Sequence, residues 1–410
     1  MQDYTELLAE LCRSHRVPAA QLVVCDAEGS TDTTFGTAKP DTVFPLGSLT
    51  KPFTAALAMV LVEDGDLDLD EPLGEHLPEL DQAVTLRQVL SHTGGWASNI
   101  DEDADHTANR AHWLANHWRD TGLVHRPGEV FSYSNIGYLV AGHLVEVVTG
   151  MDWAEAVEEI LLRPWGITPS FVTSTGTTGS RGTAEGHTVL PDGRVVPVGP
   201  QSVLDVEAPN GGLALSATDL VTFVSTHLTS AEVFGEMCRD QLGSVAVGPF
   251  GMADSWGLGW ARYGSWSGHD GTGDGTSCHL RFDQGTGNAV ALTTNAGTGL
   301  DLWRDLAAKL GVADEGLGDP GEPVPADPEA VGRYVNGPSE FVVSQGREGA
   351  LELAFGPAPA VELTCFERLR FTARALPGSS AVLSGRFLPD PATGRVELLQ
   401  ISGRLARRHG

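Results

Sequence analysis

Ser48 and Lys51 are spaced so that their side chains could do chemistry together. They stand three residues apart at the start of an apolar segment, residues 48–63, and residues i and i+3 share one face of a helix. A serine hydroxyl is too weakly acidic to attack a carbonyl unaided, but a desolvated, neutral lysine can serve as its base. The helix start also leaves the Ser48 N–H free to stabilise an oxyanion. The pair predicts acyl transfer through a serine ester, although such spacing alone more often marks a capping serine beside an unrelated lysine.

Tyr133 and Asn135 directly precede a second apolar helix, predicted over residues 136–148. A phenol beside a lysine could relay a proton between nucleophile and leaving group, with its own pKa lowered by the cation. The Asn135 amide could hold Lys51 and a substrate carbonyl. Taken alone, these residues are more typical of a turn that packs against a helix.

A third segment, Gly268-His269-Asp270-Gly271-Thr272-Gly273, runs into a predicted strand. Its small residues would let a substrate backbone lie along the edge of a sheet, and the Thr272 N–H could be the second donor to an oxyanion. The other interpretation of this segment alone is an ordinary glycine-rich hairpin.

In this chain order, the three segments resemble the serine β-lactamase and penicillin-binding-protein superfamily, whose pattern is SxxK, then YxN or SxN, then KTG or HxG. Further stretches within residues 5–310 resemble its class C β-lactamase-like branch. They are Phe44-Pro-Leu-Gly-Ser48, Leu90-Ser-His-Thr-Gly-Gly95, Pro127-Gly-Glu-Val-Phe-Ser-Tyr133, Gly211-Gly-Leu213 with Ala217-Thr-Asp-Leu220, and Thr294-Asn295. So many motifs in the right order make coincidence implausible.

The resemblance implies a role for each residue. Ser48 would be the acylated nucleophile, Lys51 its base and Tyr133 the proton relay. The backbone amides of Ser48 and Thr272 would form the oxyanion hole. The residues implied in substrate binding are Asn135, His269, Asp270 and Gly271.

His269 stands where many members of this superfamily have a lysine. A fixed cation there recognises the free carboxylate of a β-lactam or of D-Ala-D-Ala, whereas a histidine is largely neutral at pH 7. We therefore expect His269 to contact the carboxylate or hydroxyl side of the substrate, and β-lactamase activity is disfavoured. Members with His-x-Gly are typically esterases, D-amino-acid amidases or peptidases, and acyltransferases.

The resemblance thus implies a serine hydrolase or acyltransferase that needs no cofactor. Penicillin-binding-protein-type thioesterases release a nonribosomal peptidyl thioester from a peptidyl carrier protein and close it head to tail. They are similar in having His-x-Gly, an appended lipocalin-like domain and no secretion signal. A macrocyclising thioesterase that acts on such a substrate through Ser48 is our first hypothesis. The alternative is a cytoplasmic esterase or a D-stereospecific peptidase or amidase. A non-catalytic binding module is disfavoured because Ser48, Lys51 and Tyr133 are all present.

The implied fold is of the mixed α/β (α+β) class, a β-lactamase/transpeptidase-like antiparallel sheet flanked by helices, with an all-helical insert over about residues 60–170. A linker rich in Gly, Pro, Asp and Glu is predicted over residues 313–330, which makes residues 1–312 the catalytic domain. Short strands recur without helices in residues 331–410, which favours a small antiparallel barrel or sandwich. The resemblance makes this a lipocalin-like barrel.

The 410 residues carry a formal charge of −28, which excludes non-specific nucleic-acid binding as the main function and disfavours anionic membranes. The apolar stretches are too short for a transmembrane helix. The first residues lack the pattern of a signal peptide, so we expect a cytoplasmic protein. The five cysteines form no CxxC pair, and neither a disulfide framework nor a zinc cluster is predicted.

Histidines and tryptophans recur at helical spacing between residues 112 and 118. His112, Trp113, His117 and Trp118 invite a metal hypothesis, but no carboxylate joins them in a known ligand pattern. We expect instead a lid helix with an aromatic face over the pocket, and no metal.

Overall fold

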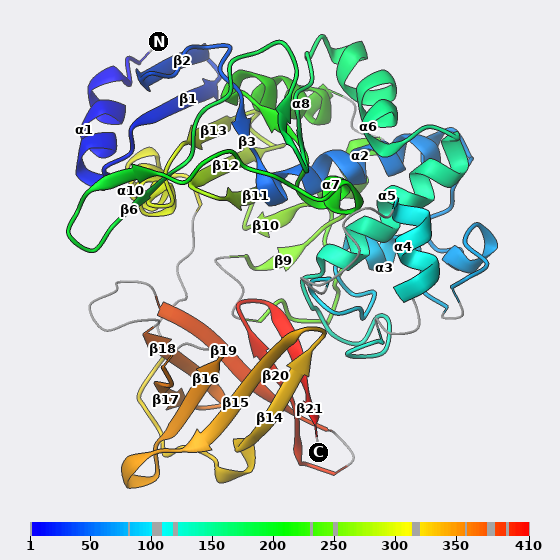
Figure 1. Ribbon diagram of the computed structural model, residues 1–410, viewed down its shortest axis with the longest axis vertical. Coiled ribbons are helices and arrows are strands. Elements are labelled where there is room, and N and C mark those ends of the chain that lie inside the picture. Colours follow the sequence, from blue (N-terminus) through cyan, green and yellow to red (C-terminus); the bar gives the residue numbers. More distant parts are fainter. Residues whose placement is uncertain are drawn as a thin grey trace.

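The computed structural model describes most of the chain, and Figure 1 labels its elements. The residues described are 2–80, 83–100, 109–117, 122–229, 233–248, 253–313, 320–356, 359–374, 382–390 and 393–409. They form a mixed α/β body, at the top in Figure 1, and a β-barrel below it.

An antiparallel sheet forms the centre of the α/β body. Its described strands run in the order β2-β1-β13-β12-β11-β10-β9, so that strands from the two ends of this body pair with each other. The strands are β1 (Ala19–Asp26), β2 (Gly29–Gly36), β9 (Ser255–Trp256), β10 (Ala261–Tyr263), β11 (Trp266–Gly273), β12 (Thr276–Asp283) and β13 (Ala289–Thr294). Every residue of β12 is buried, as expected for a strand at the centre of a sheet covered on both faces.

Helices cover the two faces of this sheet. On one face lie α1 (Thr5–His15) and α10 (Gly299–Leu310), and on the other lie α2 (Lys51–Glu63) and α8 (Ala217–Thr229). Leu22 and Val24 of β1 pack with the first pair, whereas Ala19 and Val23 pack with the second pair. Alternate residues of one strand thus supply two separate cores.

The remaining elements of the α/β body are the long helix α5, shorter helices and turns, and strand pairs. The helices and turns are η1 (Gly47–Thr50), η2 (Leu73–Glu75), α3 (Leu86–Leu90), α4 (Arg110–His117), α5 (Asn135–Thr149), α6 (Trp153–Ala156), the π-helical η3 (Val157–Leu162), η4 (Arg163–Trp165), η5 (Asp205–Glu207), α7 (Ala208–Gly211) and α9 (Val233–Met237). The strand pairs are β3 (Phe44–Pro45) with β8 (Ala214–Leu215), β4 (Phe171–Thr173) with β5 (Gly176–Thr178), and β6 (His187–Val189) with β7 (Val195–Pro197).

The C-terminal strands close into a barrel, because the first of them, β14, pairs with the last, β21. The described barrel consists of β14 (Gly332–Asn336), β15 (Ser339–Gln345), β16 (Leu351–Phe355), β17 (Val361–Phe366), β18 (Arg370–Arg374), β19 (Val382–Pro389), β20 (Val396–Ile401) and β21 (Arg404–His409), with the turns η6 (Pro328–Ala330) and η7 (Arg347–Gly349). Tyr334, Phe371, Phe387 and Leu399 belong to its buried apolar core.

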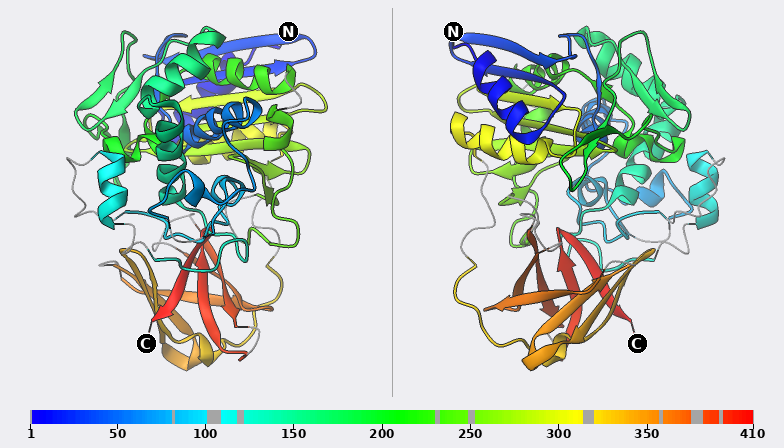
Figure 2. Two further views of the ribbon diagram at one scale, coloured as in Figure 1. Left: turned by 90° about the vertical axis from the view of Figure 1, so that its right-hand side faces the viewer. Right: turned by 60° about the vertical axis from the view of Figure 1, so that its left-hand side comes forward.

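The barrel packs against the segment that carries Tyr133. The Tyr133 N–H donates to the Gly403 carbonyl at 2.9 Å, and the Leu405 N–H donates to the Ser132 hydroxyl at 3.1 Å. Figures 1 and 2 show the β20–β21 hairpin, in red, pointing from the barrel into the α/β body. The barrel is therefore in direct contact with the region expected to hold the site.

The fold class predicted from the sequence is confirmed by the helix-flanked antiparallel sheet and the closed barrel. The helix expected to start at Ser48 begins at Lys51 instead, after the turn η1. Trp113 is buried in the main core and does not form the face of a lid, while Trp118 lies outside the described residues. The boundaries at residues 312 and 331 stay a prediction. Among the described helices, none is both long and apolar enough to cross a membrane.

Asn336 of β14 offers a test of the contact between the two bodies. Its Oδ1 accepts the Ser98 N–H at 2.7 Å, and its Nδ2 donates to the Ser98 hydroxyl at 3.1 Å. Ser98 in turn donates from Oγ to the Tyr133 carbonyl at 3.0 Å. Asn336→Ala leaves a buried N–H without its acceptor, so thermal and urea unfolding should show a loss of about 1–3 kcal/mol.

The matched control is Ser344→Ala, at an exposed barrel position, which should leave stability unchanged. Equal unfolding curves for Asn336→Ala and Ser344→Ala would contradict a structural role for this contact.

Candidate active site

Ser48 and Lys51 lie together at the junction of η1 and α2. The Lys51 Nζ is 3.1 Å from Ser48 Oγ and 3.0 Å from the Asn210 carbonyl oxygen, to which it donates. Lys51 is completely buried, and this burial, together with the nearby Arg404 charge, lowers the pKa of Lys51 well below its ordinary value. A neutral amine that donates to Asn210 keeps its lone pair for the Ser48 proton, so the geometry suits a lysine base.

Tyr133 reaches Ser48 from the segment before α5. Its hydroxyl is hydrogen bonded to Ser48, and the Lys51 Nζ lies 5.1 Å from the centre of its ring. Burial raises the pKa of Tyr133 to about 12, although the Ser48 hydrogen bond and the Arg404 charge act in the opposite direction. The expectation of a lowered pKa is wrong, because burial outweighs the effects of Ser48 and Arg404. The phenol stays protonated and can give its proton to a leaving group.

A neutral histidine supports the Tyr133 ring. The His92 ring lies 4.2 Å from the Tyr133 ring, between centroids, and its Nδ1 accepts the Ser134 N–H at 3.1 Å. His92 adopts a φ of 58°, in the left-handed region, and burial lowers its pKa well below the usual value. We interpret His92 as a structural residue, and its local backbone strain is typical of positions near functional sites.

The backbone amides expected to form an oxyanion hole come from two closely packed segments. A Cβ atom on Gly47 of η1 would lie 2.2 Å from the Thr272 carbonyl oxygen. A Cβ atom on Gly271 of β11 would lie 1.8 Å from the Leu46 carbonyl oxygen. Only glycine allows β11 and η1 to approach this closely. Gly271 therefore acts by bringing the Thr272 backbone to Ser48, where two amide donors can face one oxyanion.

Asn135 lines the pocket beside Ser48. Its Nδ2 donates to Asn99 Oδ1 at 2.7 Å, while its own Oδ1 is buried and has no hydrogen-bond partner among the residues described. We expected Asn135 to hold Lys51, but the Asn210 carbonyl does so instead. The Asn135 Oδ1 remains available to accept an N–H of a substrate.

His269 is buried beside Tyr133 and Trp256, with 4% of its surface exposed. Its Nδ1 lies 2.6 Å from the Asp270 carbonyl oxygen, which can only accept, so Nδ1 carries the proton. Burial lowers the pKa of His269 to about 3, and the ring is neutral. Its Nε2 has no partner in the described part of the chain. His269 can therefore accept a hydrogen bond from substrate but cannot attract a carboxylate as a cation would.

The Asp270 carboxylate does not serve the substrate as expected. It accepts hydrogen bonds from Arg281 Nη1 and Nη2, both at 2.9 Å, and one from His279 Nδ1 at 2.8 Å. Burial opposes its ionisation, but Arg281 and His279 outweigh this effect and keep the pKa of Asp270 well below its usual range. Successive strand residues face opposite sides, so Asp270 supports β11 from the face opposite to His269.

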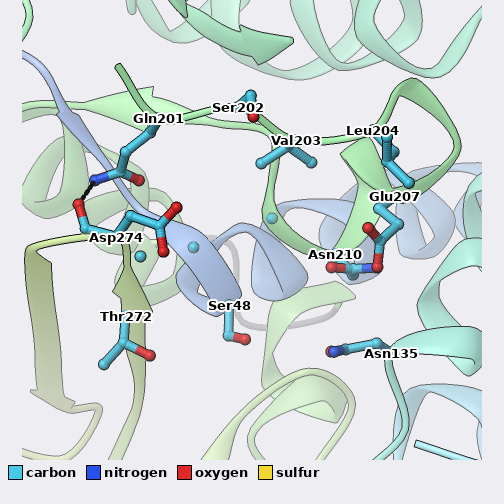
Figure 3. A pocket seen from close by; sticks show the side chains of 13 residues that line it. Ser48, Asn135, Gln201, Ser202, Val203, Leu204, Glu207, Asn210, Thr272 and Asp274 are labelled. Atoms are coloured by element: carbon cyan, nitrogen blue, oxygen red, sulfur yellow. Dashed lines mark hydrogen bonds between the residues drawn. The ribbon is translucent and has the colours of Figure 1, made fainter. Parts of the chain in front are cut away.

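A pocket of about 310 Å³ opens at Ser48 and is shown in Figure 3. Ser48 and Thr272 lie along one part of it, and the segment 201–211 supplies the facing wall. Among the described residues, no group of three or more His, Cys, Asp or Glu side chains is arranged to hold a metal ion.

The barrel contributes Arg404 to this centre. Its guanidinium carbon lies 5.1 Å from the centre of the Tyr133 ring, and its Nε is buried without a partner among the residues described. A guanidinium here can bind a carboxylate or a carbonyl oxygen of a substrate.

Sequence reasoning missed Arg404, Asn210 and Glu207. Arg404 follows an ordinary hairpin turn and stands 271 residues after Tyr133, so no spacing marks it. Asn210 directly precedes the Gly211-Gly-Leu213 motif, and this neighbourhood could have drawn attention to it.

Comparisons with known proteins agree with the class of enzyme that this site defines, a serine hydrolase or acyltransferase. Residues 4–314 match the family described as Beta-lactamase. Penicillin-binding protein 4 of Amycolatopsis lactamdurans is 32% identical in an alignment 328 residues long, which covers 70% of this chain and 82% of that protein. The crystal structure of SurE covers 98% of both chains with 36% identity and a TM-score of 0.86. A D-amino acid amidase from Ochrobactrum anthropi SV3, 22% identical over 74% of this chain and 97% of its own, has a TM-score of 0.61 and shares the fold.

The chain belongs to the Beta-lactamase family, which includes the penicillin-binding proteins. The predicted superfamily is therefore confirmed.

Lys51→Met tests whether the amine is uncharged in the folded protein. The pKa of Lys51 is lowered in the folded protein from its ordinary value of 10.5. At a pH between the folded and the unfolded pKa, Lys51 therefore binds a proton in the unfolded chain but not in the native one. Wild-type stability therefore rises with pH in that window. Within that window, below pH 10.5, urea unfolding should show wild type gaining on Lys51→Met by up to about 1.4 kcal/mol per pH unit. Lys309→Met, at an exposed site, is the control, and parallel pH curves for all three proteins would contradict a neutral Lys51.

Gly271→Ala tests the close approach of β11 to η1. Its Cβ would meet the Leu46 carbonyl oxygen and the Leu49 nitrogen, and backbone atoms cannot rotate aside. Because β11 must retreat, the two amides separate, and the rate of Ser48 acylation should fall about 10²–10³-fold. Release of thiol from a thioester measures this rate. Gly297→Ala is the control, because its Cβ would meet open space, and its Ser48 should be acylated at the normal rate. If Gly271→Ala is also acylated at the normal rate, the Thr272 N–H is not part of the oxyanion hole.

Proposed function

We propose that this chain is a thioesterase that takes a peptidyl chain from a carrier-bound thioester onto Ser48 and releases it as a macrocycle. The observation that carries the proposal is the buried acid–base set around Ser48, in which Lys51, with its lowered pKa, can accept a proton and Tyr133 can donate one. This set serves any acyl transfer through a serine ester. The neighbouring pocket of about 310 Å³ supplies room for an acceptor beside that ester.

The proposed reaction has two stages. Lys51 removes the Ser48 proton, the Ser48 Oγ attacks the thioester carbonyl, and the thiolate leaves with a proton from Tyr133, which Lys51 then replenishes. The peptide amine next attacks the ester carbonyl and loses a proton to Lys51. The C–O bond breaks as Tyr133 gives a proton to Ser48, and Lys51 then passes its proton to Tyr133. A thioester and an amine thus become an amide and a thiol, and the enzyme is regenerated.

Recognition of the acyl donor is assigned to Arg404 and His269. Neutral His269 would accept a hydrogen bond from the substrate. Arg404 would supply the positive charge that many relatives supply with a lysine at the position of His269. A structure of SurE with D-Leu, 37% identical over 98% of both chains with a TM-score of 0.84, supports a D-residue as the acyl group.

The proposed partner is a peptidyl carrier protein, and the proposed compartment is the cytoplasm, where such thioesters are made. Support comes from the five cysteines, all of which are free thiols, as is usual in a reducing compartment. A net charge of −28 does not favour nucleic acid or anionic membranes as partners.

A cytoplasmic esterase or a D-stereospecific peptidase or amidase is the second candidate. It is favoured by the fold shared with a D-amino acid amidase, because water can replace the amine in the second stage without any change in the catalytic set.

A linear peptidyl thioester with a C-terminal D-residue tests the proposal. Incubation should release the thiol and yield a product lighter than the linear acid by one water, as read by mass spectrometry. The same peptide with a C-terminal L-residue should react at least tenfold more slowly, and Ser48→Ala should not react. Formation of linear acid alone would refute cyclisation, and turnover of a D-amino-acid amide at a comparable rate would favour the second candidate.

A further inference from the structure

One wall of the Ser48 pocket carries polar groups that the acyl-transfer steps do not use. Glu207 ends the turn η5 and Asn210 lies in α7, and both line the pocket. In Figure 3 both head groups lie on the side toward which the Ser48 hydroxyl points. A ligand that reaches the Ser48 ester from this side would meet both groups.

Asn210 has an unused hydrogen-bond donor. The residue is 8% exposed, and its Nδ2 has no hydrogen-bond partner among the described residues. A buried donor without an acceptor is unfavourable, and a carbonyl oxygen bound in the pocket would satisfy it.

The wall is held in place by hydrogen bonds from two helices. Arg110 of α4 donates from Nε to the Val206 carbonyl at 3.0 Å and from Nη2 to the Asp205 carbonyl at 2.7 Å. Thr54 of α2 donates to the Pro209 carbonyl at 2.7 Å. The backbone on both sides of Glu207 is therefore fixed, as a preformed binding site requires.

The charge of the pocket favours a cation. Its lining includes Glu207 and Asp274 and, among the described residues, neither lysine nor arginine. The Glu207 carboxylate is also near enough to Lys51 to act on its charge. A carboxylate beside an amide donor matches the amino end of a peptide, where an ammonium group is two bonds from a carbonyl.

We propose that Glu207 and Asn210 form a subsite for a primary ammonium group with an adjacent carbonyl, the Glu207 carboxylate binding the ammonium and Asn210 Nδ2 the carbonyl oxygen. This deepens the proposed function, on which its use in cyclisation rests. The ammonium has two possible sources, the amino end of the acyl acceptor or the free α-amine of a short acyl donor. As an acceptor, the ammonium first releases one proton through Glu207 to solvent, and the free amine then attacks as described above.

Binding is measured first, without catalysis, by calorimetric titration of Ser48→Ala with leucinamide and with N-acetylleucinamide. The ammonium form should bind and the acetylated form should bind much more weakly. In the Ser48→Ala protein, the second substitution Glu207→Gln should weaken leucinamide binding about ten- to hundredfold, which is the effect of losing a charged hydrogen bond. Adding Asp205→Asn, the same charge change at an exposed residue of the same turn, should have no effect. Equal binding of the two amides, no binding of leucinamide, or no effect of Glu207→Gln would overturn the subsite.

The source of the ammonium is then decided with active enzyme. The assay uses an N-acetylated donor thioester with leucinamide as the acceptor. Glu207→Gln should need about ten- to hundredfold more leucinamide before the rate of aminolysis equals the rate of hydrolysis. The rate of thiol release should stay normal. If Glu207→Gln instead raises KM only for donors with a free α-amine, the donor is the source. Failure of macrocyclisation would refute the proposed function and leave the calorimetric result standing, so the two failures are distinguishable.

Discussion

A lysine amine can remove a proton from Ser48 only while it carries none itself, and burial of Lys51 favours that state by lowering its pKa. The same burial raises the pKa of Tyr133 to about 12 and lowers that of His269 to about 3, so both of these neighbours of Ser48 are neutral near pH 7. The surrounding core has to exclude water for this to hold. Catalytic competence therefore depends on the packing of α2 and α5 as much as on the reactive atoms.

The barrel is part of the same arrangement. Through Gly403 and Asn336 it holds the backbone around Tyr133, and through Arg404 it places a cation against the phenol ring. That cation helps to keep Lys51 uncharged. Its position on a rigid hairpin, rather than on a loop, suits a group that has to stay at a set distance from the reaction centre.

Much of the fold and of the reactive centre could be predicted. Lys51 meets Ser48 because residues i and i+3 share a face, and this spacing is local. Asp270 shows where such reasoning ends: its neighbours Arg281 and His279 come from the adjacent strand, and strand register is not visible in one sequence. The direction of the Tyr133 pKa shift likewise depends on burial, which no motif encodes.

The sequence by itself determined the reaction class, since the order and spacing of three short motifs specify a serine, its base and a phenol. It also determined the two kinds of architecture, because the family resemblance implied the helix-flanked sheet and short strands recurring without helices indicated the barrel. Only the tertiary structure decided which side chains face the reaction centre, that His269 is neutral, that Glu207 and Asn210 line the Ser48 pocket, and that Arg404 lies against the Tyr133 ring. These facts depend on which distant segments pack together and how much water they exclude, and both are properties of the folded chain as a whole.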